Sequence, residues 1–311
     1  MKKRLYILII TIYAFVVIKA QQDIAWTHYW MLEPQYNAAA IGKNDALRII
    51  GAYSSQMSGY TDAPNTMYLG VDLPLYFLNS HHALGASFLN DKLGLFEHKR
   101  VTFQYAYRCA MAGGRLSIGG QVDMLNETLD GSKIDVDEDG DKALPSGRID
   151  GSRFDASFGL YFNRPDFYVG ISANHLTAPK IILGETNEIS IKRAYYFTGG
   201  YNIKLRNPLF TIHPSVFGVY DGTEYKAIVS ARMDYSNDNK KLFGGANYSP
   251  QHSVAVFVGG IFHGVMLTYS YEAYTSGIGL GNGAHEVVLS YEMKLDLYKK
   301  GKNRHQSVRW L

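Results

Sequence analysis

The chain of 311 residues has a single cysteine, only nine prolines and, beyond its first twenty residues, no long apolar run. The lone Cys109 excludes an intramolecular disulfide. A membrane-spanning helix needs roughly 20 consecutive apolar residues, so the lack of such a run excludes a helical membrane protein. The formal net charge of +3 is too small to favour a nucleic acid as partner. No Pro- or Ser-rich linker divides the chain, which favours one domain.

The N-terminus has the pattern of a secretory signal peptide. Lys2, Lys3 and Arg4 precede an apolar run at residues 5–17, and polar residues follow soon after. This run is shorter than the roughly 20 residues of a membrane anchor. Residues 1–20 are therefore predicted to be removed on export. The residue directly after the cleavage point is Gln21 and not a cysteine, so a lipid-modified N-terminus is not indicated.

Apolar residues occur in short segments in which they alternate with polar ones, and tyrosine (24), phenylalanine (15) and glycine (31) are abundant. Val265, Leu267, Tyr269 and Tyr271 alternate with other residues at the period of a β-strand. Comparable segments occupy residues 46–54, 66–73, 83–90, 100–110, 115–126, 152–162, 167–175, 192–204, 210–220, 225–234, 241–248, 253–262, 265–273 and 286–294. Most have close to the roughly 9–11 residues that a tilted bilayer-crossing strand needs, and bacterial barrels have even strand counts.

The predicted connections alternate in length. Those at residues 111–114, 163–166, 206–208 and 263–264 are short, whereas those at 57–64, 127–151, 176–191 and 274–285 are longer. Short inner turns and longer outer loops are typical of an outer-membrane barrel with both termini in the periplasm. A soluble β-sandwich, the alternative fold, has no reason to show this asymmetry.

The predicted fold class is therefore all-β: a transmembrane antiparallel up-and-down β-barrel of about 14 strands at residues 45–295. Its tyrosine-rich face would contact lipid, while Glu272, Glu286 and Glu292 would face a polar lumen or lie at strand ends. The predicted inward positions include Thr102, Gln104, Ala106, Ser117, Gly119 and Gln121. Their small or neutral side chains lack the charged ladders expected of an ion-selective pore.

Both ends of the mature chain are candidate partner-binding segments. Residues 21–44 precede the first strand and carry three aromatic residues, so they form either a lumenal plug or a periplasmic arm that docks a partner; the candidates are Trp26, Tyr29 and Trp30. The basic tail at residues 296–311 is either a solvated segment or a periplasmic docking site for an acidic partner. Its candidate residues are Lys299, Lys300, Lys302 and Arg304.

One acidic stretch suggests a cation, and nothing suggests catalysis. Asp135, Asp137, Asp139 and Asp141 lie at every second position, as at the start of a calcium loop, but Ser146 stands where such a loop has its bidentate glutamate. A solvated acidic loop tip with weak Ca²⁺ binding is the alternative. The histidines show neither a Ser-His-acid order nor a His-x-x-x-His helix, so no catalytic residue and no cofactor are predicted.

Several motifs resemble those of one family. The most specific stretch is FDASFGLYFNRPDFYVGISANHLTAPKI at residues 154–181, which contains His175, Pro179 and Lys180. LGASFLNDKLGLFE at 84–97 carries Asn90, Asp91 and Lys92, and SYEAYTSGIGLGNGAHEVVLSYEM at 270–293 carries His285 and Glu286. With the QD at residues 22–23, these resemble the PorP/SprF outer-membrane proteins of the type IX secretion and gliding machinery of Bacteroidetes. The chain departs at Ala38, where the family has proline, and at Glu272 and Ala284, where it has Asp and Ser.

The resemblance implies a non-enzymatic outer-membrane component of this machinery. It implies contacts with a periplasmic ring and motor, with a peptidoglycan-binding lipoprotein, and with a secreted adhesin or other cargo. The alternative function is a small-solute outer-membrane porin, because a barrel of about 14 strands encloses either a blocked lumen or a narrow channel. His285 and Glu286 are expected to have a positioning role, through a His–Glu hydrogen bond or a polar contact in the lumen.

Overall fold

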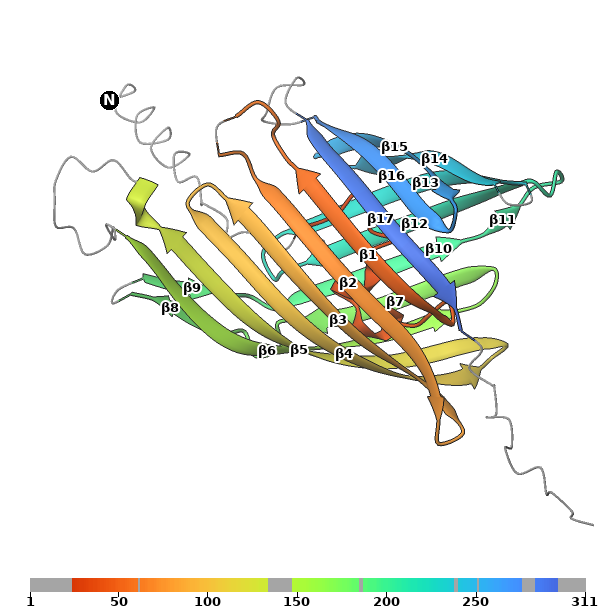
Figure 1. Ribbon diagram of the computed structural model, residues 1–311, viewed down its shortest axis with the longest axis horizontal. Coiled ribbons are helices and arrows are strands. Elements are labelled where there is room, and N and C mark those ends of the chain that lie inside the picture. Colours follow the sequence, from red (N-terminus) through yellow and green to blue (C-terminus); the bar gives the residue numbers. More distant parts are fainter. Residues whose placement is uncertain are drawn as a thin grey trace, which may run out of the picture.

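The computed structural model describes residues 24–60, 62–133, 147–184, 187–237, 240–250, 252–275 and 283–295, which form an antiparallel β-barrel (Figure 1). The barrel strands are β1 (Ala46–Ser55), β2 (Asn65–Phe77), β3 (Ser80–Leu93), β4 (Phe96–Met111), β5 (Gly114–Asp130), β6 (Arg148–Asn163), β7 (Phe167–Asn174), β10 (Ala194–Tyr201), β11 (Ile203–Lys204), β12 (Phe210–Tyr220), β13 (Tyr225–Asn237), β14 (Lys240–Ser249), β15 (Ser253–Phe262), β16 (Val265–Tyr274) and β17 (Ala284–Lys294). In these ranges, no helix is both long and apolar enough to cross a membrane.

Two pairings between strands that are not consecutive in the chain or that lie at the ends of the strand order close the sheet into a barrel. β1 pairs with β17, from Ala46 opposite Lys294 to Ser55 opposite His285. β10 pairs with both β7 and β12, which joins the two ends of the strand order. The described sheet has fifteen strand segments, but β10 and the two-residue β11 both lie along β12 and together form one barrel position. The barrel therefore has fourteen strand positions, as predicted, and no open edge runs along its full length.

The alternation predicted for the strands is confirmed. Outward-facing Leu267 and Tyr269 are exposed, whereas inward-facing Thr268 and Ser270 are buried. The same outward exposure of apolar side chains recurs around the barrel, with Phe103 and Val258 as examples. A soluble sandwich would bury these side chains instead, so the pattern is that of a wall in contact with lipid.

The two ends of the barrel differ as the sequence predicts. At one end, here called the turn end, the connections at residues 78–79, 112–113, 164–166 and 263–264 are short. At the other, here called the loop end, four connections are longer, at residues 56–64, 131–147, 175–193 and 275–283, and those at 94–95, 221–224 and 250–252 are short. The expected loop at 127–151 was too long, because the ladder between β5 and β6 continues to Asp130 opposite Arg148.

A second, two-stranded sheet was not predicted. β8 (Lys180–Leu183) and β9 (Asn187–Ser190) form a hairpin within the connection between β7 and β10. Ile181 and Leu183 pack in a buried cluster with Leu125 and Leu129, whose side chains point inward from β5. Four-residue strands within a long loop are too short for alternation to reveal, and the cluster that stabilises the hairpin is made by residues distant in sequence.

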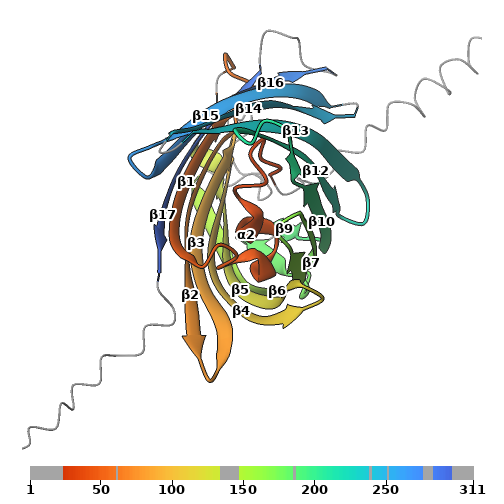
Figure 2. The same ribbon diagram turned by 90° about the vertical axis from the view of Figure 1, so that its right-hand side faces the viewer.

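The described segment before β1, residues 24–45, lies inside the barrel (Figure 2). It contains the single-turn helix α2 (Glu33–Tyr36) and the 3₁₀ turn η1 (Ala38–Ala40), and Asn37 accepts a hydrogen bond from the Ala39 amide to cap η1. Its first residues lie near the loop end, where Ala25 is close to Ser249 and Ser253. Its last residue, Asp45, joins β1 at the turn end. Residues 24–45, named the plug below, therefore traverse the lumen from one end to the other.

Candidate functional site

Glu286 binds the beginning of the plug. Its alternating position on β17 directs the carboxylate into the lumen, where it is almost fully buried. The backbone amides of Thr27 and His28 donate to its two oxygens, each at 2.9 Å, and His28 Nδ1 lies 2.5 Å from Oε1. The other ring nitrogen of His28 bonds the Thr268 hydroxyl. A single carboxylate thus satisfies three polar groups of the plug in a buried place, where unpaired groups are costly.

Of the two contacts expected for the His285-Glu286 pair, Glu286 makes the polar contact in the lumen, and no hydrogen bond joins the two neighbours. The two residues are adjacent on a strand, so their side chains point to opposite faces. His285 faces outward, and its Nδ1 lies 2.7 Å from the Tyr269 hydroxyl. A His–Glu contact does occur, but its histidine is His28. The sequence separation of 258 residues between His28 and Glu286 explains why local patterns could not reveal it.

Aromatic residues hold the middle of the plug against β10 and β12. The Tyr36 ring centroid lies 4.7 Å from that of Phe217 and 5.3 Å from that of Tyr196, and the Tyr29 centroid lies 5.2 Å from Phe217. The Tyr29 hydroxyl also bonds Ser215 Oγ at 2.7 Å. Aromatic pairs at these distances stabilise beyond their buried area.

The aromatic partner-binding candidates are therefore used within the barrel. Trp26 and Tyr29 are almost fully buried, and Trp26 Nε1 donates to Gln35 Oε1 at 2.6 Å. Trp30 lies under the guanidinium of Arg232, whose carbon is 3.9 Å from the ring centroid. The expectation that these side chains are displayed to a partner is not supported, because they contact the plug itself and the barrel wall.

The wall approaches the plug closely where it carries glycine. A Cβ atom on Gly119 of β5 would lie 2.3 Å from the Ala39 amide nitrogen, and one on Gly159 of β6 would lie 2.0 Å from Asn37 Oδ1. Real Cβ contacts are never this short, so only glycine allows η1 to sit at this depth. The amide of Asn37 also donates to the Leu160 and Ile171 carbonyls, at 3.0 and 3.2 Å.

Polar wall residues contact α2. Gln104 Nε2 donates to the Pro34 carbonyl at 2.6 Å, and the Tyr161 hydroxyl donates to Glu33 Oε2 at 3.1 Å. The Lys43 ammonium also pairs with Glu33. Gln104 and its neighbour Gln121 are buried and face the lumen, as the sequence predicted. Their amides bind the plug and each other, so these inward residues belong to a packed interior.

Charged residues bind the end of the plug. Asp45 bonds Arg108 at 3.1 Å and Arg115 at 2.5 Å. Arg48 donates to Asp72 at 2.9 Å and to the Met31 carbonyl at 2.9 Å. Partial burial alone would raise the pKa of the Asp45 carboxyl, but the Arg115 hydrogen bond and the charges of Arg108 and Arg115 outweigh burial and lower this pKa.

The lumen is thus more charged than the six inward positions on β4 and β5 suggested. Arg48 and Asp72 are among several buried charged residues that point inward. They form pairs with each other and with the plug, and they do not line up as an uncompensated ladder of one sign. Such pairing stabilises a closed interior, because a buried charge is tolerated only when it is paired and hydrogen-bonded.

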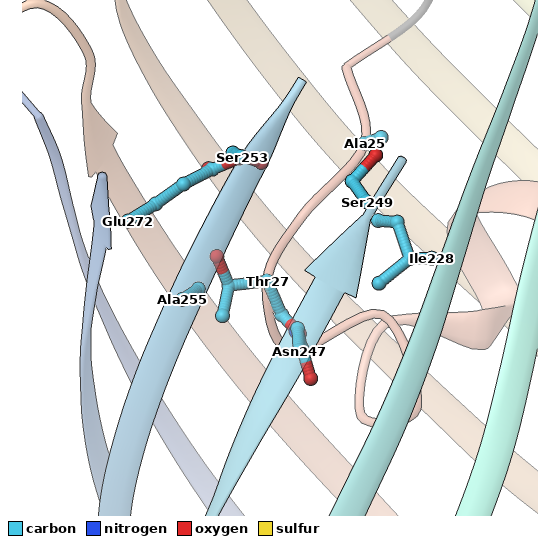
Figure 3. A pocket seen from close by; sticks show the side chains of 8 residues that line it. All are labelled: Ala25, Thr27, Ile228, Asn247, Ser249, Ser253, Ala255 and Glu272. Atoms are coloured by element: carbon cyan, nitrogen blue, oxygen red, sulfur yellow. The ribbon is translucent and has the colours of Figure 1, made fainter. Parts of the chain in front are cut away.

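Two cavities lie beside the plug. The smaller, of about 10 Å³, is at the loop end between Thr27, Asn247, Ser253 and Glu272 (Figure 3). This volume matches about one water molecule. Ser253 bonds Glu272 at its rim. The larger, of about 380 Å³, lies between the plug and the wall from β7 to β17, toward the turn end.

The remaining predicted residues have varied surroundings. Glu292, near the turn end, accepts from Asn44 Nδ2 at 2.9 Å. On β3, next to Asn90, Asp91 accepts from the Thr66 hydroxyl at 2.6 Å, and Lys92 lies 3.7 Å from Glu97. The basic-tail candidates and the four aspartates of the proposed calcium loop lie outside the described residues.

The motif at His175, Pro179 and Lys180 leads into the β8–β9 hairpin. His175 Nδ1 lies 2.6 Å from a carboxylate oxygen of Asp155 on β6, and the Pro179 carbonyl accepts from the Ile191 amide at 3.0 Å. Lys180 pairs with Glu188 of β9 at 2.9 Å. These contacts position the hairpin, which agrees with a structural role for the motif.

Comparison with known proteins assigns the family. Residues 18–291 match the family described as type IX secretion system membrane protein PorP/SprF. The chain belongs to this family. No curated protein matches the chain. Its membership and fold make it an outer-membrane β-barrel and a membrane component of a type IX secretion system, and they indicate a non-enzymatic protein.

Solved outer-membrane barrels share the fold at low sequence identity. The CymD monoaromatic hydrocarbon channel is 14% identical, with a TM-score of 0.50 over 89% of this chain and 95% of that one. The Ralstonia pickettii toluene transporter TbuX is 13% identical, with a TM-score of 0.49 over 83% of this chain and 92% of that one. A Pseudomonas aeruginosa FadL homologue is 10% identical, with a TM-score of 0.49 and the same two coverages.

Proposed function

We propose that this PorP/SprF protein is a non-enzymatic link in the type IX secretion and gliding machinery. In this role it connects periplasmic components with the secretion or surface anchoring of a cargo protein. The periplasmic partners are the ring and motor components and a peptidoglycan-binding lipoprotein, and the cargo is a secreted adhesin or another exported protein. Lipid surrounds the barrel wall, and neither a nucleic acid nor a cofactor takes part; at most, the loop with Asp135 to Asp141 binds Ca²⁺ weakly.

The observation that carries this proposal is the filled lumen. The plug is bound by Glu286 near the loop end, by Tyr196 and Phe217 in the middle, and by Arg108 and Arg115 at the turn end. A pore that passes solutes needs a continuous path, whereas a protein anchor needs only a stable wall and two accessible ends. The contacts along the plug support an anchor.

The proposal places the turn end in the periplasm and the loop end outside the cell, because short periplasmic turns and long external loops are the rule for bacterial barrels. The described chain ends at Leu295, close to the turn end, so the basic tail would begin in the periplasm, where the proposed partners reside. The plug, in contrast, begins near the loop end. Residues 24–28 would therefore lie close to the cell exterior in this orientation.

A small-solute channel is the second candidate. The fold likeness to a monoaromatic hydrocarbon channel and the cavity of about 380 Å³ beside the plug favour it. It would require the plug to move, since the plug passes through the lumen. Single-channel conductance of the purified barrel in planar bilayers tests it: a steady conductance in the unmodified protein would favour the channel over the anchor.

The decisive experiment is affinity purification of the tagged protein from detergent-solubilised outer membranes, followed by mass spectrometry. Recovery of periplasmic ring components or a peptidoglycan-binding lipoprotein would support a place in the core apparatus. Recovery of one large adhesin would support anchoring of that cargo. Recovery of the barrel alone, together with a steady conductance, would refute the proposal.

A further inference from the structure

One strand of the barrel is paired on only one side over half its length. β6 pairs with β5 along its whole extent, from Arg148 opposite Asp130 to Asn163 opposite Arg115. On its other side, β7 pairs only with residues 158–163. Within the described parts of the chain, residues 148–157 thus form an edge at the loop end without a paired strand, and the Ala156 carbonyl there accepts from the Leu176 amide at 2.9 Å.

The Ala156 contact shows which backbone groups point toward this edge. In an antiparallel pair, residues alternate between those that bond the neighbouring strand and those that point away from it. Because the Ala156 carbonyl points away from β5, so do the N–H and C=O groups of the residues two, four, six and eight positions before it. They are Phe154, Ser152, Asp150 and Arg148.

Most of these edge groups have no partner among the described residues. The Ser152 carbonyl accepts from the guanidinium of Arg153 at 3.0 Å. The other edge-directed groups of Arg148, Asp150, Ser152 and Phe154 make no backbone hydrogen bond within the described parts of the chain. Four N–H groups and three carbonyls therefore form a row of alternating donors and acceptors.

The β8–β9 hairpin leaves this edge open, although it follows β7 directly. A Cβ on Gly151 would lie 2.4 Å from the Ile182 carbonyl oxygen. Since Gly151 lies opposite the buried, inward-facing Glu127, this contact places β8 on the inner face of β6. Figure 1 shows β8 and β9 beside the loop-end portions of β5 and β6. The hairpin covers one face of this ribbon, and its two strands pair with each other and not with the edge of β6.

The free edge lies beyond the lipid-contacting belt. Lipid cannot satisfy open backbone groups, so an unpaired edge is excluded from the hydrocarbon layer. The outward side chains of the first part of the edge agree, since those of Arg148, Asp150 and Ser152 are polar and exposed. The outward residues that follow, Phe154 (72% exposed) and Ala156, are apolar. The edge thus faces water at the loop end, on the side where the proposed function places the cargo.

We propose that residues 148–156 of β6 bind an extended segment of a secreted protein by antiparallel strand addition, on the side of β6 where no described strand pairs with them. This inference rests on the proposed function for the identity of the partner. An extended polypeptide is the ligand that matches a row of alternating backbone donors and acceptors. The opposite charges of Arg148 and Asp150 disfavour indiscriminate pairing, while a cognate strand places complementary charges opposite them.

The test is photo-crosslinking in living cells with the full-length protein. A p-benzoylphenylalanine at position 154 should form an adduct with a secreted protein. The same probe at position 103, which is similarly exposed at 66% but lies in the lipid-facing wall, should form none. No adduct at 154, or an adduct only with another part of the same chain, would overturn the proposal.

Ser152→Pro separates backbone pairing from side-chain contact. Proline removes the edge-directed N–H and leaves the ladder with β5 intact, since edge positions tolerate proline. We expect Ser152→Pro to reduce the adduct at least tenfold and the matched Ser152→Ala to leave it unchanged, with barrel folding verified by heat-modifiable gel migration. An undiminished adduct in the folded Ser152→Pro variant would overturn strand addition.

The two hypotheses fail separately. Recovery of secretion components in the affinity purification, without an adduct at position 154, would refute strand addition alone. An adduct with a secreted protein at position 154 shows that cargo contacts the loop end of this barrel. It would therefore support both, whereas a steady conductance without any recovered partner would refute the proposed function and with it the partner assumed here.

Discussion

Replacing Glu286 with alanine should release the first residues of the plug while the barrel stays folded. The carboxylate accepts hydrogen bonds from two backbone amides of the plug and contacts the His28 ring, and all of these groups are buried. A hydrogen bond to a charged group contributes about 1.5–3 kcal/mol, and contributions from neighbouring bonds do not add fully. A net loss of about 3 kcal/mol is therefore expected for the docking of residues 24–28.

A loss of about 3 kcal/mol raises the fraction of undocked plug on the order of a hundredfold. The assay is maleimide labelling of an Ala25→Cys variant in which Cys109 has been replaced, so that the only thiol reports on the plug. The initial labelling rate should rise strongly in the Glu286→Ala background. Tyr29 and Tyr36 remain packed against Phe217, so the rest of the plug should stay in place and conductance should change little.

Glu292→Ala is the matched control. Glu292 is on the same strand, but its carboxylate is at the turn end and accepts from the Asn44 side chain. Labelling of Ala25→Cys should stay at the parent rate in this variant. An unchanged labelling rate in Glu286→Ala would refute the view that this carboxylate holds the plug, and an equal increase in both variants would show a general loosening of the barrel.

Three further predictions follow from the same contacts. Gly159→Ala should displace Asn37 and lower the midpoint of thermal unfolding, whereas Gly120→Ala, whose Cβ would lie 3.8 Å from its nearest neighbour, should be neutral; equal midpoints would contradict the close approach. Because its pKa is lowered in the fold, Asp45 should stabilise the turn-end contact above the ordinary carboxyl pKa of about 3.9, and this contribution should disappear as the pH falls through the lower folded value. Tryptophan fluorescence from pH 7 to pH 2 should therefore show an acid transition that Asp45→Asn lacks; a transition of the same size in both proteins would refute this role. Deleting residues 131–147 should leave heat-modifiable folding intact and reduce cargo at the cell surface, and normal surface cargo would refute a role of this loop.

The strands were predictable because the membrane acts on every residue of the wall in the same way. Lipid outside and polar groups inside require alternation, so Leu267 and Thr268 reveal their faces without reference to any partner. Loop asymmetry could be deduced for the same reason. The length of the connection between β5 and β6 could not be deduced from the sequence. The pairing of these two strands continues beyond the membrane, where side chains such as those of Arg148 and Asp150 are polar, so no change in polarity marks the end of the strand.

The candidate site was only partly predictable. The aromatic residues at 26–30 and the carboxylate of Glu286 were both singled out, but they were assigned to separate roles. For His285 and Glu286 the expectation was either a hydrogen bond between these sequence neighbours or a polar contact in the lumen. Adjacent strand residues point to opposite faces, so this pairing was excluded by geometry that the sequence already contained.

The sequence by itself determined the class of this protein: a chain whose alternating strands and unequal connections require a closed barrel in a membrane. Only the tertiary structure decided what fills that barrel. The contacts of His28 with Glu286 and of Asn37 with Leu160 and Ile171 join residues that are far apart in the chain. They arise because closing the sheet brings every inward side chain to one enclosed space, where polar groups must find partners or remain at a cost.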